Sequence, residues 1–256
     1  MSRRRTARTP EARGMSRAAT LFAAMLVLAA PGVANADTAD DCEQVDIAAL
    51  ALRACTTLLA DPNLDEAMKA QIYTLRGAAW AKEEEPAQGV LDFTRTIEIS
   101  GSHLDAIRGR AKAYETLGKH ELAAADFARL IELEPGNEEH YRKRAAAYLA
   151  AGKPELALAD YGKAIEIKPD NVEAHIGRAQ VHVHANDRTQ ALEDFDRALE
   201  IDPKSVPALM ARAIVRDSWG ENKLAIEDYL AALHNNGMNL KARQALQRLG
   251  VDTPPN

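Results

Sequence analysis

Apolar residues recur along this chain at the spacing of paired helices. In one representative stretch, Tyr141, Ala145 and Tyr148 are three and four residues apart and so share one helical face. A few residues later, Ala157 and Tyr161 share a face in the same way. Both faces combine large and small residues, and the small ones let two helices approach closely. The spacing predicts two amphipathic helices packed through these faces.

Glycine and proline mark the ends of the two helices. Gly152 and Pro154 interrupt the pattern between them, and Pro169 follows the second. Glycine readily adopts the backbone conformation of a turn, and proline cannot continue a helix. The predicted unit is therefore a helix, a tight turn, a second antiparallel helix and a short turn.

This unit occurs five times, each copy 34 residues after the last. Every copy carries an arginine on its first helix and, sixteen residues later, an aspartate followed by an aromatic residue on its second. In chain order these are Arg76 and Asp92, Arg110 and Asp126, Arg144 and Asp160, Arg178 and Asp194, and Arg212 and Asp228. Because nothing is left over between copies, each buries its apolar face by stacking on its neighbours. The chain is predicted to be an all-α solenoid.

The third copy also has the residue types of a known repeat. Its large, small, aromatic, turn and terminating residues fall where the tetratricopeptide repeat has them: Tyr141, Ala145, Tyr148, Gly152, Ala157, Tyr161, Ala164 and Pro169. The chain therefore resembles the tetratricopeptide repeat (TPR) family, of a bacterial exported type whose repeats contain this arginine and aspartate. The resemblance implies an all-α, right-handed superhelical solenoid of antiparallel helix pairs.

The period accounts for nearly the whole chain. Residues 1–36 are expected to be a signal peptide, and residues 37–69 a leading half-repeat with one helix over 46–59. Five TPR units follow, at 70–103, 104–137, 138–171, 172–205 and 206–239. Residues 240–256 are expected to form a capping helix and a tail. The cap residues expected to face water are Lys241, Arg243, Gln244 and Arg248.

The N-terminus has the three parts of a secretory signal peptide. Six arginines lie between Arg3 and Arg17, residues 18–30 are apolar and uncharged, and Ala34 and Ala36 form a small-x-small cleavage site. A spanning helix needs about 20 apolar residues, so this stretch is too short to anchor the chain. Cleavage after Ala36 would leave the mature protein periplasmic or secreted, without membrane insertion.

Two points about the N-terminus stay open. Arg3 and Arg4, with Arg5, leave twin-arginine export as an alternative to the general secretory route, although Thr6 and Ala7 do not continue that motif with apolar residues. Translation begins at either Met1 or Met15.

Composition narrows the class of partner. The net charge is -6, and the mature chain is more acidic because the signal peptide carries arginines away. An acidic chain is unsuited to non-specific nucleic-acid binding. No nucleophile elbow, phosphate loop or dinucleotide fingerprint occurs in the sequence. We expect a protein or peptide partner, no nucleic acid, no cofactor and no enzymatic activity.

The two cysteines, Cys42 and Cys55, both lie in the leading segment. In an oxidising compartment such a pair is usually bridged, and two buried free thiols are the alternative. A Cys42–Cys55 disulfide would hold the preceding chain against the helix predicted over 46–59. In the chain-entropy model, closing a loop of this size contributes about 3 kcal/mol.

The repeated arginines and aspartates are expected to form ion pairs within each repeat. The leading segment has Ala54 where the aspartate would be, yet Arg76 follows; Leu246 stands where an arginine would follow Asp228. Pairing inside each repeat therefore matches all five of each residue. Both positions border the buried face, so we expect these pairs to fix the register of the helices rather than to bind a ligand.

Three histidines, His175, His182 and His184, raise the question of a metal site. His182 and His184 are two residues apart, so on a helix they point to different sides. His175 and His182 replace Tyr141 and Tyr148 of the preceding copy. We interpret them as packing residues and expect no metal site.

A binding surface follows from the TPR resemblance, since in that family the first helix of each unit lines a concave groove. The groove residues singled out here are Arg108, Lys112, Arg142, Leu149, Ile176, Val183, Met210 and Ile214. The last five would form an exposed apolar strip, which in a soluble protein usually marks an interaction surface. The resemblance predicts a helical or extended ligand with apolar anchors and an acidic end.

The sequence leaves three functions open. The leading hypothesis is an exported scaffold or adaptor that binds a protein or peptide in its groove, within an envelope assembly. The alternative is a self-assembling structural protein, in which the apolar strip of one copy is covered by another in a homo-oligomer. A metal-binding or enzymatic protein is the third.

Overall fold

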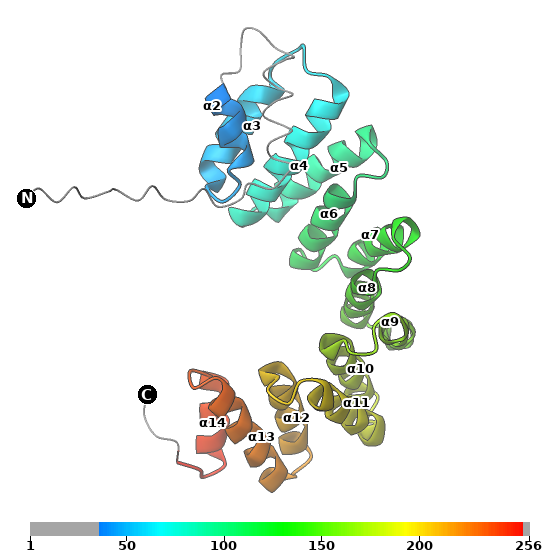
Figure 1. Ribbon diagram of the computed structural model, residues 1–256, viewed down its shortest axis with the longest axis vertical. Coiled ribbons are helices and arrows are strands. Elements are labelled where there is room, and N and C mark those ends of the chain that lie inside the picture. Colours follow the sequence, from blue (N-terminus) through cyan, green and yellow to red (C-terminus); the bar gives the residue numbers. More distant parts are fainter. Residues whose placement is uncertain (1–35, 253–256) are drawn as a thin grey trace, which may run out of the picture. The chain divides into compact units, whose positions relative to one another are not determined.

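The structure is a computed structural model that describes residues 36–252 (Figure 1). The expected signal peptide, apart from Ala36, lies outside these residues. Within 36–252 every regular element is an α-helix and no strand occurs. The predicted all-α class of packed antiparallel helix pairs is confirmed.

The helices follow the predicted order. Their bounds are α2 (Ala36–Glu43), α3 (Ala48–Leu59), α4 (Glu66–Lys82), α5 (Pro86–Ile99), α6 (Leu104–Thr116), α7 (His120–Leu133), α8 (Glu138–Ala150), α9 (Pro154–Ile167), α10 (Val172–His184), α11 (Arg188–Ile201), α12 (Val206–Ser218), α13 (Asn222–Asn235) and α14 (Leu240–Arg248). The chain divides into two compact units between Gly109 and Arg110, within α6.

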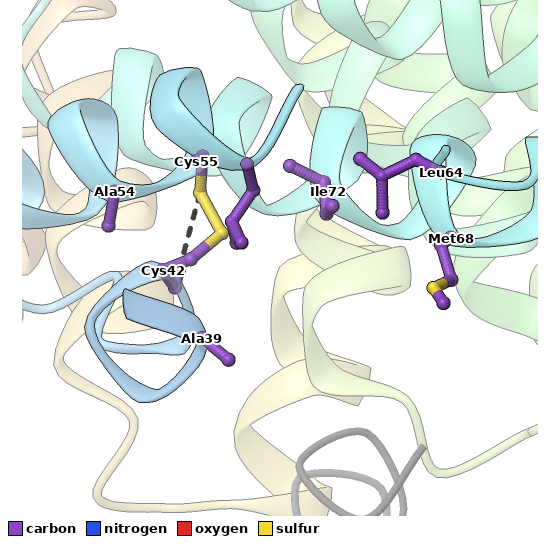
Figure 2. Packing of buried hydrophobic residues seen from close by; sticks show 8 residues of the cluster. Ala39, Cys42, Ala54, Cys55, Leu64, Met68 and Ile72 are labelled. Atoms are coloured by element: carbon purple, nitrogen blue, oxygen red, sulfur yellow. Dashed lines mark hydrogen bonds between the residues drawn. A yellow bond between two sulfur atoms is a disulfide. The ribbon is translucent and has the colours of Figure 1, made fainter. Parts of the chain in front are cut away.

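A disulfide lies near the N-terminal end of the described part of the first unit. Cys42 of α2 and Cys55 of α3 are bonded, and both side chains are fully buried. Figure 2 shows this bond beside Ala39, in one core with Met68 and Ile72 of α4. The chain before α3 is itself a helix, which the sequence analysis did not anticipate. The disulfide therefore joins two helices that both pack on α4.

Neighbouring repeats approach each other closely where the residue at the contact is glycine, which has no side chain. A Cβ atom added at Gly109 of α6 would lie 2.5 Å from the ring of Phe93 of α5. In the second unit, a Cβ atom at Gly177 of α10 would lie 2.3 Å from the ring of Tyr161 of α9. At these two junctions the aromatic residue of one repeat lies directly on the backbone of the next first helix.

Each repeated arginine donates two hydrogen bonds to the aspartate of its own repeat. In the third repeat, Arg144 Nε donates to Asp160 Oδ2 and Arg144 Nη2 to Asp160 Oδ1, both at 2.7 Å. The same two bonds join Arg76 with Asp92, Arg110 with Asp126, Arg178 with Asp194 and Arg212 with Asp228. All five aspartates are buried. This is the pairing that the residue count favoured.

In the third repeat, aromatic rings also flank the paired arginine. The Arg144 guanidinium carbon lies 5.8 Å from the centres of both the Tyr141 and the Tyr148 rings. Its hydrogen bonds to Asp160 raise the pKa of Arg144, although burial alone would lower it. Both carboxylate oxygens of Asp160 are occupied, so the pair joins the first helix of the repeat to the second.

The turn inside each repeat needs a left-handed backbone. Gly118, Gly152 and Gly220 have φ angles of 68°, 71° and 79°, and the same repeat position is taken by Glu84 at 60° and Asn186 at 58°. A residue with a side chain is strained there by about 1–2 kcal/mol, and asparagine less so. The first repeat therefore carries local strain at Glu84.

We expect Glu84→Gly to raise the free energy of unfolding by about 1 kcal/mol, because glycine adopts this backbone without a Cβ clash. Urea denaturation followed by circular dichroism measures the change. The control is Glu83→Gly, since Glu83 has an ordinary φ of -80° at the end of α4 and glycine should destabilise it. Equal losses of stability from both changes would contradict the assignment of strain to Glu84.

Arg144→Ala should lower the free energy of unfolding by about 2–3 kcal/mol, because it leaves the buried carboxylate of Asp160 unpaired. The double variant Arg144→Ala with Asp160→Ala should recover part of that loss. The matched control is Arg197→Ala, which removes an exposed arginine paired with Glu200 and should cost well under about 1 kcal/mol. Equal thermal midpoints for the two single variants would contradict a structural role for the pair.

Candidate functional site

The predicted cations of the binding surface fall in different surroundings. Arg108 is exposed in the first unit, and its Nη1 donates to Asp105 Oδ1 at 2.7 Å. Lys112 is exposed in the second unit. Arg142 is also in the second unit, and its Nη2 lies 3.9 Å from Glu139 Oε1. The expected residues are therefore divided between the two units and do not form one site within either of them.

Arg142 is less available than the sequence suggested. Only 25% of its side chain is exposed, and its buried Nε has no hydrogen-bond partner. Its charge acts on two neighbours. Burial raises the pKa of Glu115, which Lys143, Arg142 and other nearby cations partly counteract, and burial raises the pKa of Tyr161 against the charge of Arg142. The guanidinium thus lies partly between helices, which corrects its expected role as an exposed receiver of carboxylates.

The expected apolar strip is also only partly exposed. Ile176 is buried, with 8% of its surface exposed, in a core shared with Phe195 of α11 and Val215 of α12. Its inclusion in an exposed strip was wrong, because α11 and α12 cover that side of α10. Leu149 and Val183 are half-buried against their local cores. Ile214, at 52% exposure, is the most open member of the strip.

Two open hollows in the second unit meet along α12. The larger, about 490 Å³, is lined by Gln180, Val183, His184, Phe195, Pro207, Met210, Ala211, Ile214, Val215, Asn239 and Lys241. The smaller, about 300 Å³, is lined by Met210, Ile214, Tyr229, Lys241, Gln244, Ala245 and Arg248. Met210, Ile214 and Lys241 line both. We call the two hollows together the α12 groove.

The α14 side of this groove was missed in the sequence analysis, which placed those residues on a solvent-facing cap. The 34-residue period could have predicted this side of the groove. Lys241, Gln244 and Arg248 lie 34 residues after Pro207, Met210 and Ile214 respectively. One further step of the repeat therefore places them on the same helical face as α12. The cap helix acts as the first helix of a sixth unit and forms one wall of the groove.

A polar cluster attaches α14 to the preceding pair. Arg248 of α14 forms an ion pair with Asp217 of α12, and the Tyr229 hydroxyl donates to Asp217 Oδ2 at 3.4 Å. Burial and the charge of Asp217 raise the pKa of Tyr229 to about 12. Leu246 is fully buried against Tyr229 in the same core. The wall formed by α14 is thus fixed by packing and by charge.

The histidines do more than fill space. His175 is buried, with Nδ1 3.4 Å from Asp194 Oδ1 and Nε2 3.1 Å from the carbonyl oxygen of Pro169. His182 Nε2 lies 4.0 Å from Asp194 Oδ2. Burial would raise the pKa of Asp194, but hydrogen bonds from His175 and Arg178 outweigh it and the pKa is lowered. The interpretation of His175 and His182 as packing residues was incomplete, because both also face the carboxylate of the ion pair.

Residues 36–252 contain neither a metal-binding cluster nor a membrane-spanning helix. No group of three or more histidine, cysteine, aspartate or glutamate side chains in this part of the chain is arranged to hold a metal ion. None of its helices has the length and apolar character needed to span a bilayer.

Comparison with known proteins agrees with the fold. Two tetratricopeptide repeat family models match, one over residues 108–172 and one over 148–215. No curated protein sequence matches the chain.

Several solved structures are similar in fold. A crystal structure of MamA protein is 14% identical, covering 74% of this chain and 100% of its own, with a TM-score of 0.57. MamA from Desulfovibrio magneticus RS-1 is 17% identical, with coverages of 75% and 99% and a TM-score of 0.58. A thermophilic TPR protein from Thermus thermophilus is 20% identical, with coverages of 70% and 98% and a TM-score of 0.58.

These similarities establish the fold and leave the partner open. The repeated helix pairs, the family models over residues 108–215 and the solved TPR structures lead to one assignment. Residues 108–215 match the tetratricopeptide repeat, and the protein is a TPR protein.

Proposed function

We propose that this protein is an exported scaffold that binds a segment of another protein, within an envelope assembly, through the exposed sides of its first helices. The observation that carries the proposal is the α12 groove, whose apolar floor is open to solvent. Ile214 in that floor is 52% exposed. An apolar hollow rimmed by polar groups is the usual form of a protein interaction site.

The distribution of charges supports binding at this face. The arginine and aspartate that recur in all five repeats bond to each other, so they are occupied by the fold. The outward positions of the first helices differ from repeat to repeat: Gln180 of α10 and Ile214 of α12, 34 residues apart, occupy corresponding sites and both line the α12 groove. Recognition is therefore assigned to these variable positions.

Export is the second part of the proposal. It rests on the signal-peptide pattern of residues 1–36, together with the Cys42–Cys55 disulfide. Disulfides form and persist in oxidising compartments such as the periplasm. A disulfide that closes the N-terminal core is consistent with folding after export.

Expression of the full chain in a bacterial host tests export. We expect the mature protein in the periplasmic fraction, beginning at Asp37 by N-terminal sequencing, because Ala34 and Ala36 form the cleavage site. Thiol titration of the unfolded, unreduced protein should detect no free cysteine, and the reduced sample provides the control. Protein retained in the cytoplasm with both thiols free would contradict the proposal.

Self-assembly is a second candidate, favoured by apolar residues beside the cap helix. Met238, in the turn before α14, is 83% exposed, and Leu240, the first residue of α14, is 64% exposed. A second copy of the chain could cover them. Light scattering of the purified protein distinguishes the two functions, since a scaffold for another protein is expected to be monomeric and a self-assembling element is not.

Ile214→Ser tests the groove with a partner isolated from periplasmic extract. It should speed dissociation of that partner by about tenfold, because a desolvated apolar anchor mainly holds a formed complex. The matched control is Leu224→Ser, which removes a similarly exposed side chain of α13 outside the groove. Both variants should keep the helicity of the parent. A partner whose dissociation rate is unchanged by Ile214→Ser would place its binding site elsewhere.

A further inference from the structure

We infer that the α12 groove binds a peptide segment in which an apolar side chain lies next to a carboxylate, with the apolar side chain on Met210 and Ile214 and the carboxylate at Lys241. The inference rests on the proposed function and specifies the chemistry of its ligand. It places the receiving cation on α14, whereas the sequence analysis placed it on Arg108, Lys112 and Arg142.

The floor of the groove supplies the apolar half of the site. Met210 and Ile214 line both hollows, and Val183 and Ala245 extend the apolar surface on either side. Met210 is half-buried against the core around Tyr229, so it is held from behind while one side faces the groove. A methionine adapts its shape to different apolar partners. This floor accepts a branched or aromatic side chain without specifying one.

The rim supplies the charged half. Lys241 is exposed and lines both hollows, and among residues 36–252 its ammonium group has no ion-pair partner. Arg248 at the same rim is already paired with Asp217. Neither hollow has an aspartate or glutamate among its described lining residues. Lys241 is thus left to bind a carboxylate that comes from outside.

The groove differs in charge from the rest of the molecule. The whole chain has a net charge of -6, whereas the charged residues lining the two hollows are cations. This complementarity selects an acidic segment over a basic one and steers its approach. Gln180 and Gln244 at the edges can donate to and accept from a peptide backbone. An extended peptide segment can contact the apolar floor, the cationic rim and the two glutamine side chains together.

Lys241 has a well-matched control within the same unit. It is the second residue of α14, and Lys223 is the second residue of α13. Both are exposed, but Lys223 lines neither hollow. Replacement by glutamate near a helix N-terminus is compatible with the helix dipole at either position. A difference between the two variants therefore reports on the groove rather than on helix stability.

The first test is a selection from a random-peptide library on the immobilised full chain, run in parallel on Lys241→Glu, Lys241→Gln and Lys223→Glu. On the parent and on Lys223→Glu, we expect peptides that place Asp or Glu beside Leu, Ile, Met or Phe. Lys241→Gln should lose the acidic preference, and Lys241→Glu should select Lys or Arg in its place. Apolar peptides with no charge preference on the parent would overturn the role of Lys241.

The second test measures the affinity of the most enriched peptide, synthesised with both ends capped, by calorimetry. Lys241→Glu should weaken binding by about tenfold and reverse its salt dependence, because added salt then screens a repulsion instead of an attraction. Ile214→Ser should also weaken binding by about tenfold. Lys223→Glu and Leu224→Ser should leave the affinity unchanged.

The outcomes separate this inference from the proposed function. Peptides that bind the parent but are insensitive to both Lys241→Glu and Ile214→Ser would overturn the inference while leaving peptide binding in place. Failure of the parent to enrich any peptide above background would overturn the proposed function and the inference together.

Discussion

The buried carboxylate in each repeat is the constraint on which the rest of the structure depends. An aspartate at the edge of a core must be paired, because an isolated buried charge costs far more than a helix pair can contribute. Its partner is an arginine on the other helix of the same repeat, held by two hydrogen bonds. Two bonds in one plane fix the position of the first helix along the second, and so the register of every pair.

That register also restricts which residues the next repeat can have at the contact. With the helices of one repeat fixed, its aromatic residue projects onto the next first helix, and Gly109 and Gly177 leave room for Phe93 and Tyr161. At these two junctions the contact between repeats is a ring against a backbone. Packing of this kind tolerates little side-chain volume, so the stacking face is restricted while the outward face of each first helix is free to differ.

The first and last helices that the structure describes each lack a neighbouring repeat on one side, and they are attached in different ways. At the N-terminal end the Cys42–Cys55 disulfide joins α2 to α3, a covalent bond in place of a repeated core. At the C-terminal end α14 keeps the register of a first helix, and its buried Leu246 and the Arg248–Asp217 ion pair attach it to α12 and α13. Because α14 keeps that register, the cap also forms a wall of the α12 groove, where the structure combines an apolar floor with an exposed cation.

The sequence by itself determined the helix pairs, their period, the residues of each ion pair and three floor residues of the groove, Val183, Met210 and Ile214. These depend on spacing along one helix, which fixes the residues that share a face. Only the tertiary structure decided that Ile176 and Arg142 are covered and that Lys241 lines the same hollows as Met210 and Ile214. Exposure depends on how closely the neighbouring helices approach. That distance is set jointly by side chains on several helices, so the spacing of residues along one helix does not predict it.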